Sequence, residues 1–482
     1  MNGEGEDVMA FRISCTSVVH MSTPRTHDAA SRPRIQPAEA GDTRPLSISA
    51  RLGRLQFHNS GKFRVLQLAD IQDGPRIAAD TIRLIEAAAD TVRPDLVVFT
   101  GNQIAGYDEA YADTFRRRRW ETPGNEGHGF ALWKSARNAN KAKASEDVEH
   151  TRSLVRSSIE QFIEPLNKRS IPWAVTYGNH DAQCGLDYEE MDAIYRSLPG
   201  CLNPAAPESA LDDGGVAQEG AEAESVFADG YSLALPDQKV IPCEPGTFIL
   251  PVSDVTRSTT IFNLAVVNSG DYAHEGGYGH PSQRALQLLQ ALPSLGAEKS
   301  CVFQHLPVEQ FYQLLKEVPP TANHAIEGYR TFGGRYFVLD EGKTLAGGYL
   351  GEGISCPDVD GGEFDTLRDS GCFALICGHD HRNAFVGEVD GITLMATPTC
   401  GFGSYGPVGE KRAARLIEFD IRHPYSPRTQ LLEFGALVGK PSARKAYTYG
   451  LSSQSRAREP EDDLLRRPTW WRRALDAIFH RR

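Results

Sequence analysis

Nine polar residues that could bind metal ions or transfer protons stand just after apolar runs of this chain. They follow "RVLQLA", "LVVFT", "WAVTY", "CVFQ" and "CFALIC", and they are Asp70, Gln72, Asn102, Asn179, His180, Asp181, His305, His379 and His381. Imidazole and carboxylate groups together suit Zn²⁺, Fe and Mn²⁺. Two such ions, about 3.5–4 Å apart, can hold the attacking and leaving oxygens of a phosphoryl transfer. These residue types therefore indicate metal chemistry, and phosphoryl transfer is one reaction that such a site can support.

Two of these positions carry neutral amides, Gln72 and Asn102, which offer ions at best an amide oxygen. If these residues held two ions with Asp181 outside the ligand set, Asp70 would be the one carboxylate to balance their roughly four or five positive charges, and uncompensated buried charge is costly. Loss of both ions, retention of a single ion and recruitment of another carboxylate all remain open.

Three further aspartates are candidates for such a recruited carboxylate. Asp73 is the nearest, and Asp108 and Asp271 are weaker candidates. Asp73 also fits a turn or an N-cap role before the helix expected near residue 79.

The elements that position these residues begin with a β-α-β-α-β pattern. Buried strands are expected at "FRVLQLA" (63–69), "LVVFT" (96–100) and "PWAVTY" (172–177), with helices between them. The apolar helix faces are Ile82, Ile85, Ala89 and Val92, then Val155, Ile159, Phe162 and Leu166. This alternation predicts parallel strands, whose carboxyl ends meet in one crevice where ligands bind.

The second half of the chain is rich in strand patterns with little alternation. The expected strands are "TTIFNLAVVNS", "SCVFQH", "GCFALICG", "GITLMATPT" and "ARLIEFDI". One helix lies among them, "PSQRALQLLQAL", whose apolar face holds Ala285, Leu288, Leu289 and Leu292. We expect a second sheet packed against the first.

The domain organisation expected from composition has three parts. Residues 1–60 lack periodicity and are predicted to be disordered, residues 61–435 form the domain, and residues 436–482 form a tail. Two insertions interrupt the domain, at 107–150 and 203–225. The second is a low-complexity loop. The first is either a lid or substrate-recognition loop, or a solvated excursion.

The tail ends in the basic segment 464–482, where Trp471, Leu475, Ile478 and Phe479 share one helical face opposite six arginines. Such a helix is typical of weak contact with an anionic membrane surface. A helix docked on the protein itself and a disordered tail are the alternatives.

Composition narrows the class of protein. The formal net charge is −12, which disfavours nonspecific nucleic-acid binding, and the nine cysteines form no C-x-x-C pair. No run approaches the ~18–20 apolar residues of a membrane-spanning helix. The N-terminus carries acidic residues where a signal peptide needs positive charge. A cytoplasmic protein is expected.

The motifs "ADIQ", "TGNQIAG", "YGNHDAQ", "FQHLP" and "CGHDH" resemble, in this order, the signature of calcineurin-like metallophosphoesterases. The branch they resemble most is the purple-acid-phosphatase-like one, and "NSGDYAHEGGYGHPSQ" and "DGITLMATPTCGFGSYG" add to the resemblance, which spans residues 63–421. It implies an α/β fold, a four-layer α/β/β/α sandwich of two mixed sheets.

The resemblance also implies roles for the residues. One ion would be held by Asp70 and His381 with Gln72 and Asn102, and the other by Asn179, His305 and His379 with Asn102. His180 would stabilise charge or protonate the leaving oxygen, and Asp181 would orient its ring. The cofactors would be one or two divalent ions (Mn, Fe or Zn).

Two functions therefore stay in view. The first is a metal-dependent hydrolase of phosphate esters with an altered metal site, acting on a phosphorylated small molecule or other phosphoester. The second is a pseudo-phosphatase that binds a phosphorylated ligand or a protein without turnover. The retained histidines and the intact His180 and Asp181 favour the first. A Rossmann-type nucleotide binder is disfavoured, because no G-x-G-x-x-G follows the first strand.

Overall fold

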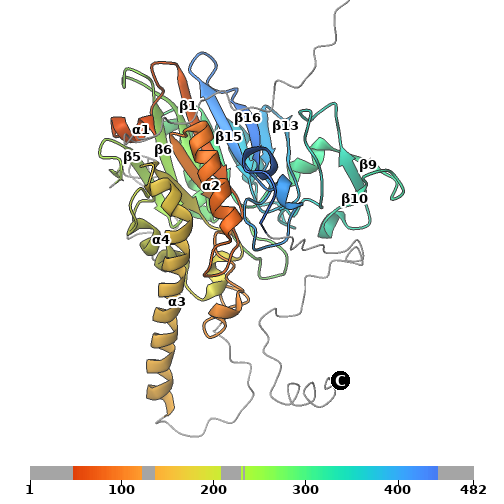
Figure 1. The fold of residues 1–482 in the computed structure, drawn as a ribbon. Helices are drawn as coiled ribbons and strands as arrows, with labels where there is room; N and C mark the ends of the chain where they lie inside the picture. The colour runs from red at the N-terminus through yellow and green to blue at the C-terminus, as the bar shows by residue number, and fades with distance from the viewer. Residues whose placement is uncertain (1–46, 122–135, 208–229, 232–233, 443–482) are drawn as a thin grey trace, which may run out of the picture. The chain divides into compact units, whose positions relative to one another are not determined.

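The structure is a computed structural model, and it describes residues 47–121, 136–207, 230–231 and 234–442, without the side chains of 136–142 and 230–231. Its strands form two large mixed sheets and one small sheet in these ranges (Figure 1). Its α-helices are α1 (Ile48–Leu52), α2 (Ala79–Val92), α3 (Ala136–Asn167), α4 (Tyr188–Arg196), α6 (Gln283–Ala291), α7 (Glu363–Asp369) and α8 (Phe434–Leu437).

The first sheet contains the three strands of the predicted β-α-β-α-β unit, in the order β16-β15-β1-β2-β3. Its strands are β1 (Lys62–Leu68), β2 (Leu96–Thr100), β3 (Trp173–Thr176), β15 (Ala413–Asp420) and β16 (Arg428–Glu433). β1, β2 and β3 are parallel, which confirms the prediction. β15 pairs antiparallel with β1, so a strand from the far end of the domain lies next to the first strand in this sheet.

The second sheet has the order β13-β14-β12-β8-β7-β6-β5-β4. Its strands are β4 (Gly230–Tyr231), β5 (Lys239–Glu244), β6 (Thr247–Ser253), β7 (Thr260–Val266), β8 (Ser300–Gln304), β12 (Cys372–Cys377), β13 (Phe385–Val389) and β14 (Ile392–Ala396). β7, β8, β12 and β14 are parallel. Their carboxyl ends therefore lie at one edge.

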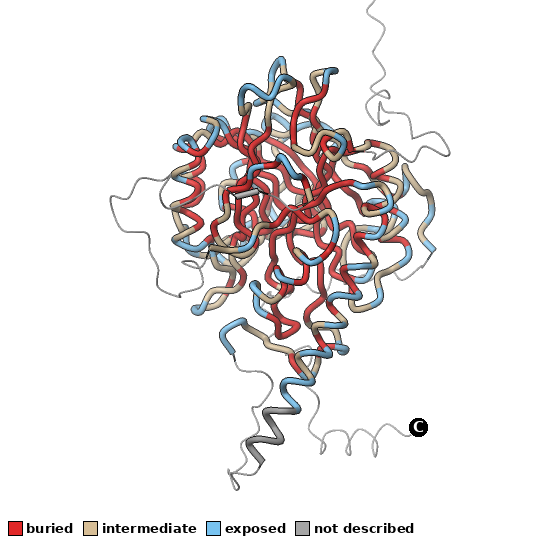
Figure 2. The backbone as a smooth tube through the Cα atoms, turned by 90° about the vertical axis from the view of Figure 1, so that its left-hand side faces the viewer, coloured by how far each residue is buried: buried red, intermediate tan, exposed pale blue. Residues whose placement is uncertain are grey.

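Apolar side chains divide into three groups that define the layers. One group packs the first sheet against α2, α3 and α4, and a second packs the other sheet against α6 and α7. The third lies between the sheets and includes Val65, Phe303 and Phe419. Helix, sheet, sheet and helix thus follow one another, as the four-layer expectation requires. Figure 2 shows the buried residues gathered in the interior of the fold and the exposed ones around it.

The helices follow their apolar periodicity. The predicted faces of α3 and α6 are fully buried at all eight positions, for example at Phe162 and Leu289. In α2 the buried face is rotated from the predicted one, because Leu84 and Ala88 are fully buried while Ile82 is only partly so. An Asp187–Glu190 capping box starts α4 and satisfies free N–H groups of its first turn.

A small third sheet was not predicted. Its strands pair in the order β10-β11-β9, with β9 (Leu315–Val318), β10 (Ile326–Glu327) and β11 (Tyr336–Leu339). Four-residue and two-residue strands are too short to produce a readable alternation.

Three predicted boundaries need correction. Order begins before residue 60, since α1 forms at 48–52 and the side chains of Leu55 and Phe57 are fully buried. Residues 136–150 belong to α3, so a helix takes up the end of the first insertion, and Figure 1 shows it running on beyond the sheet. Asn203 belongs to the domain, because its side chain pairs with both backbone groups of Val175.

Other predictions concern residues outside the described ranges. The disorder of 1–46, most of the 203–225 loop and the basic helix at 464–482 are among them. The cytoplasmic location and the membrane contact stay predictions. Over the described ranges, none of the helices combines the length and the apolar character needed to cross a bilayer.

Candidate metal centre

The carboxyl ends of β1, β2, β3, β8 and β12 meet, and the nine polar residues identified from the sequence lie at these ends. Asp70 and Asn102 follow β1 and β2, and hydrogen bonds connect them to His379 after β12 and Asn179 after β3. His305 follows β8, and its ring is fully buried. The structure thus brings residues that lie more than 300 positions apart into one cluster.

The Asn102 side chain lies at the centre of this cluster, and its partners fix its orientation. Its Oδ1 accepts the backbone N–H of His180 at 2.9 Å, and a backbone N–H can only donate. Its Nδ2 therefore points the other way, 3.2 Å from both Asp70 Oδ1 and Asn179 Oδ1. This corrects the expected role of Asn102, because its hydrogen atoms and not its oxygen face the other ligands.

Three donor atoms converge beside Asn102. His305 Nε2 lies 3.1 Å from Asn179 Oδ1 and 3.1 Å from His379 Nδ1. His305 Nδ1 lies 2.9 Å from the carbonyl oxygen of Thr100 and must carry the ring hydrogen there. The neutral ring then presents a lone pair at Nε2 to the oxygen of Asn179.

His305 Nε2 and Asn179 Oδ1 are two acceptors 3.1 Å apart, a spacing that suits ligands bound to the same cation. Burial lowers the pKa of His305, although Asp70 and the Thr100 carbonyl oppose the shift, and this favours the neutral ring. Two ligands at 2.1 Å from one ion and 90° apart are separated by about 3 Å. Asn179, His305 and His379 therefore fit one metal ion.

The position expected for the other ion is closed by hydrogen bonds. Asp70 Oδ1 lies 3.4 Å from His381 Nε2 and accepts from Asn102, while Asp70 Oδ2 accepts the His379 backbone N–H at 2.8 Å. Burial lowers the pKa of His381, but the charge of Asp70 and its hydrogen bond outweigh burial and raise it. The Asp70–His381 pair and the Asn102 amide thus occupy the place of a cation.

Gln72 lies at the edge of this closed position. Its Nε2 donates to the hydroxyl of Tyr107 at 2.9 Å, and its Oε1 is buried without a hydrogen-bond partner in the described residues. Tyr107 in turn packs its ring against His180, with centroids 4.8 Å apart. The unpaired oxygen of Gln72 is the feature of this position that still suits a cation.

Across the described ranges, no three His, Cys, Asp or Glu side chains form a metal-binding group. At the position of His305 and His379, the third ligand atom comes from an asparagine, Asn179.

Backbone strain is concentrated at these strand ends. A left-handed φ costs a residue with a side chain about 1–2 kcal/mol. The site residues with such values are Asp70 (54°), Gln72 (43°), Asn102 (51°) and His379 (70°). The surrounding fold holds all four in place, so the ligand geometry of the cluster is preorganised.

His180 is oriented by a residue that the sequence analysis missed. Gln183 Oε1 lies 2.7 Å from His180 Nδ1, and Gln183 Nε2 donates to the carbonyl of Arg117, which fixes which atom faces the ring. His180 Nδ1 therefore donates, and Nε2 is left as an acceptor. Desolvation lowers the pKa of His180 to about 4, so the ring is neutral at pH 7. The only sequence signal for this role of Gln183 is its position three residues after His180.

Asp181 has a structural role in place of the predicted one. Its carboxylate accepts the backbone N–H groups of Asn102, Gly178 and Ile104 at 2.7, 2.7 and 3.0 Å, so it holds the loops after β2 and β3 together. Burial raises its pKa to about 7 against the effect of these bonds. It orients the strand ends rather than the His180 ring.

We expect Asp181→Asn to lower the free energy of unfolding by about 3 kcal/mol, because an amide NH₂ would face a backbone N–H in a buried site. Urea denaturation measures this loss. Asp187→Asn, at the exposed cap of α4, is the matched control and should cost less than about 1 kcal/mol. Equal losses in both variants would show that Asp181 does not hold the loops.

The three aspartates considered as recruited metal ligands have other roles in the structure. Asp73 accepts hydrogen bonds from the Ala78 backbone N–H and the Thr81 hydroxyl, which is the turn or N-cap role considered as its alternative. Asp108 caps a short 3-10 helix. Asp271 pairs with Arg119 at 3.4 Å. The carboxylate that does influence the cluster is Glu352, whose charge helps to raise the pKa of His381. Glu352 does not follow a strand pattern in the sequence, so the sequence analysis did not identify it.

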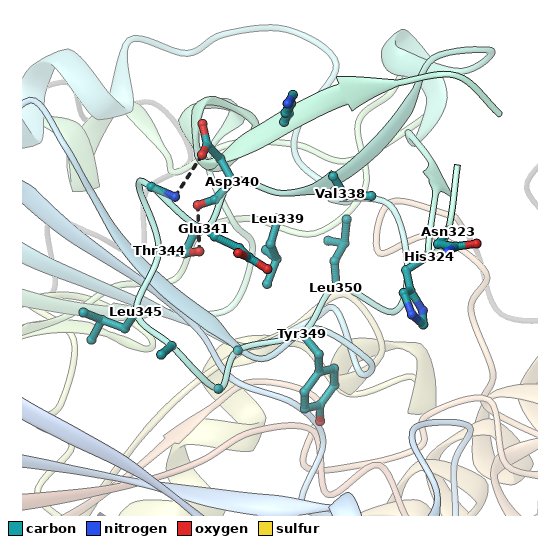
Figure 3. A pocket seen from close by; sticks show the side chains of 15 residues that line it. Asn323, His324, Val338, Leu339, Asp340, Glu341, Thr344, Leu345, Tyr349 and Leu350 are labelled. Atoms are coloured by element: carbon teal, nitrogen blue, oxygen red, sulfur yellow. Dashed lines mark hydrogen bonds between the residues drawn. The ribbon is translucent and has the colours of Figure 1, made fainter. Parts of the chain in front are cut away.

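A surface hollow of about 1060 Å³ lies away from this cluster, beside β11 and the segment that follows it (Figure 3). Its lining includes Asp340, Leu345, Tyr349 and Leu350, and none of the nine polar residues. The candidate centre is a tightly packed cluster and not this hollow.

The comparison with known families now identifies the class. The model of the calcineurin-like phosphoesterases matches residues 63–383, more than half of the chain, and the chain belongs to this family. The match runs from the start of β1 to just beyond His381, so it includes every strand end that carries the cluster. The expected resemblance is therefore confirmed.

Individual relatives are distant. The chain is 21% identical to "Probable inactive purple acid phosphatase 29" of Arabidopsis thaliana over 78% of this chain and 82% of that protein. It is 23% identical to "Phosphatase DCR2" of Saccharomyces cerevisiae over 71% of this chain and 48% of that protein. A solved dimetal phosphatase from Danio rerio aligns with 77% of this chain and 99% of that one, at 12% identity and a TM-score of 0.34.

Proposed function

We propose that this protein hydrolyses phosphate esters with a single divalent metal ion held by Asn179, His305 and His379. The observation that supports this most directly is the facing pair of acceptors, His305 Nε2 and Asn179 Oδ1, at 3.1 Å. The remaining position is closed by the Asp70–His381 pair and by Asn102. One position with converging ligand atoms and one closed by hydrogen bonds together support a mononuclear site.

The bound ion would act as a Lewis acid on a phosphoryl oxygen and lower the pKa of water. The chain itself supplies His180, held by Gln183 so that Nε2 is an acceptor. The negative charge of a bound phosphate ester favours the imidazolium form, so His180 takes up a proton when the ester binds and can then pass it to the leaving oxygen. Tyr107 and Gln183 keep the ring in this orientation.

A second candidate function is binding of a phosphorylated ligand without turnover. The closed position favours it, because Asp70 already pairs with His381 and accepts a hydrogen bond from Asn102. In that case the ion and His180 bind the phosphate group, and the missing second ion leaves the attacking oxygen without activation.

We expect His180→Gln to lower the rate of p-nitrophenyl phosphate hydrolysis by about 10²–10⁴-fold while the metal content is unchanged. The assay is run with Mn²⁺, Fe²⁺ and Zn²⁺ in turn. His423→Gln, an exposed histidine at the β15–β16 turn, is the matched control and should retain full activity. A wild-type protein that binds metal and phosphate but shows no hydrolysis with any ion would favour the binding function.

A further inference from the structure

The chain between β7 and α6 contains a short loop that closes on itself, and we call residues 271–279 the tyrosine loop. The Gly279 backbone N–H donates to the Asp271 carbonyl at 2.9 Å, and Tyr272 and Tyr278 face each other in an antiparallel bridge. Their rings are stacked, with centroids 5.7 Å apart. The loop sequence "DYAHEGGYG" supplies none of the three proposed metal ligands, yet its two tyrosines are held in a fixed arrangement.

Each tyrosine of the loop contacts a different proposed ligand. The Tyr272 hydroxyl accepts a hydrogen bond from Asn179 Nδ2 at 2.8 Å. The Tyr278 ring packs edge to face with the His379 ring, and their centroids lie 4.5 Å apart. The Arg118 guanidinium lies 3.6 Å from the centroid of the Tyr272 ring, and this cation–π contact helps to hold that ring in place. The tyrosine loop therefore supports two of the three ligands from outside.

The contact with Asn179 matters most, because the two ends of an amide group differ chemically. The oxygen can bind an ion, whereas the NH₂ group only donates hydrogen bonds. Asn179 Oδ1 accepts from Asn102 Nδ2 at 3.2 Å, and Asn179 Nδ2 donates to the Tyr272 hydroxyl. The opposite orientation would place the NH₂ group 3.1 Å from His305 Nε2, an acceptor that would then bind it in place of an ion. The outer partners of Asn179 thus determine which end faces the metal position.

We propose that Tyr272 is a positioning residue of the metal site, whose hydroxyl keeps the oxygen of Asn179 turned toward the ion. This rests on the proposed function, in which Asn179, His305 and His379 bind the metal. Without the hydroxyl, the Asn179 NH₂ group loses its partner and turns toward His305 Nε2, which closes the position. Loss of such an outer partner typically weakens metal binding by about 10–100-fold.

The test is calorimetric titration of the metal-free, full-length protein with Mn²⁺ and with Zn²⁺. Tyr272→Phe removes the hydroxyl and keeps the ring beside Arg118, and it should bind the ions about 10–100-fold more weakly than the wild type does. Tyr188→Phe is the matched control, because the Tyr188 hydroxyl donates to Asp271 of the same loop at 3.2 Å. This control should bind both ions like the wild type.

An Asn179→Asp background separates the positioning role from a general role in loop stability. A carboxylate has an oxygen atom at both ends, so its orientation no longer matters. In this background Tyr272→Phe should change the metal affinity by less than about threefold, as a double-mutant cycle between coupled residues requires. A role in loop stability alone would lower the affinity in both backgrounds. Thermal unfolding of the metal-free variants establishes that each is folded.

Two results would overturn the proposal and leave the proposed metal site standing. One is a Tyr272→Phe variant that binds metal like the wild type, or that loses the same affinity in both backgrounds. The other is an equal loss in Tyr272→Phe and Tyr188→Phe, because the loop and not the amide would then set the affinity. A wild-type protein that binds neither ion would instead refute the metal site of the proposed function, and the role of Tyr272 with it.

Discussion

If the proposed metal ion is held by Asn179, His305 and His379, His305→Ala will remove it, whereas Gln72→Ala will leave it in place. His305 supplies one of the three converging donor atoms, and Gln72 belongs to the position that hydrogen bonds close. Removal of outer partners of metal ligands already weakens binding by about 10–100-fold, so loss of a ligand should cost more than about 100-fold in affinity. Elemental analysis of dialysed protein measures the content, which should be about one ion per chain in the wild type.

His379→Ala provides an independent check on the same position. It should lose the ion as His305→Ala does, since His379 Nδ1 lies 3.1 Å from His305 Nε2. Thermal unfolding in chelator establishes that both variants are folded. If Gln72→Ala loses the ion and His305→Ala keeps it, the ion lies at the Asp70 position and the one-ion assignment is wrong.

Asn102→Asp will destabilise the metal-free protein by about 3–5 kcal/mol, and added metal will restore the loss. The new carboxylate would replace the amide nitrogen that lies 3.2 Å from Asp70 Oδ1 and from Asn179 Oδ1. Two buried carboxylates without a cation repel each other at that distance. Their shared pKa would rise above the unfolded value, so the destabilisation should be small at mildly acidic pH and grow as pH rises.

Urea denaturation in chelator and in Mn²⁺ measures this effect. Asn203→Asp, a buried asparagine that also bonds backbone and carboxylate groups but lies outside the centre, is the control and should not be rescued by metal. The double variant Gln72→His with Asn102→Asp should gain a second ion and show higher phosphoesterase activity than the wild type. A double variant that binds two ions yet hydrolyses no ester would show that the pocket serves binding only.

Much of the fold could be predicted because its signals are local. Strand runs such as 96–100 and the apolar faces of α3 and α6 depend on the spacing of residues within one element. The clustering of Asp70, Asn102 and His379 was predictable as well, since parallel strands bring their carboxyl ends to one edge. The short strands β9, β10 and β11 left no such periodicity in the chain.

The chemistry of the centre depends on partners far apart in sequence, which no local pattern contains. The sequence by itself determined which side chains reach the strand ends and that two of them are neutral amides. Tertiary structure alone decided that Asn102 turns its nitrogen inward, because a backbone N–H from residue 180 holds its oxygen. It also decided that Gln183 rather than Asp181 holds His180, and that Arg118 lies over Tyr272. Hydrogen-bond direction and ring stacking are set by neighbours in space, so they appear only once the strands and loops are in contact.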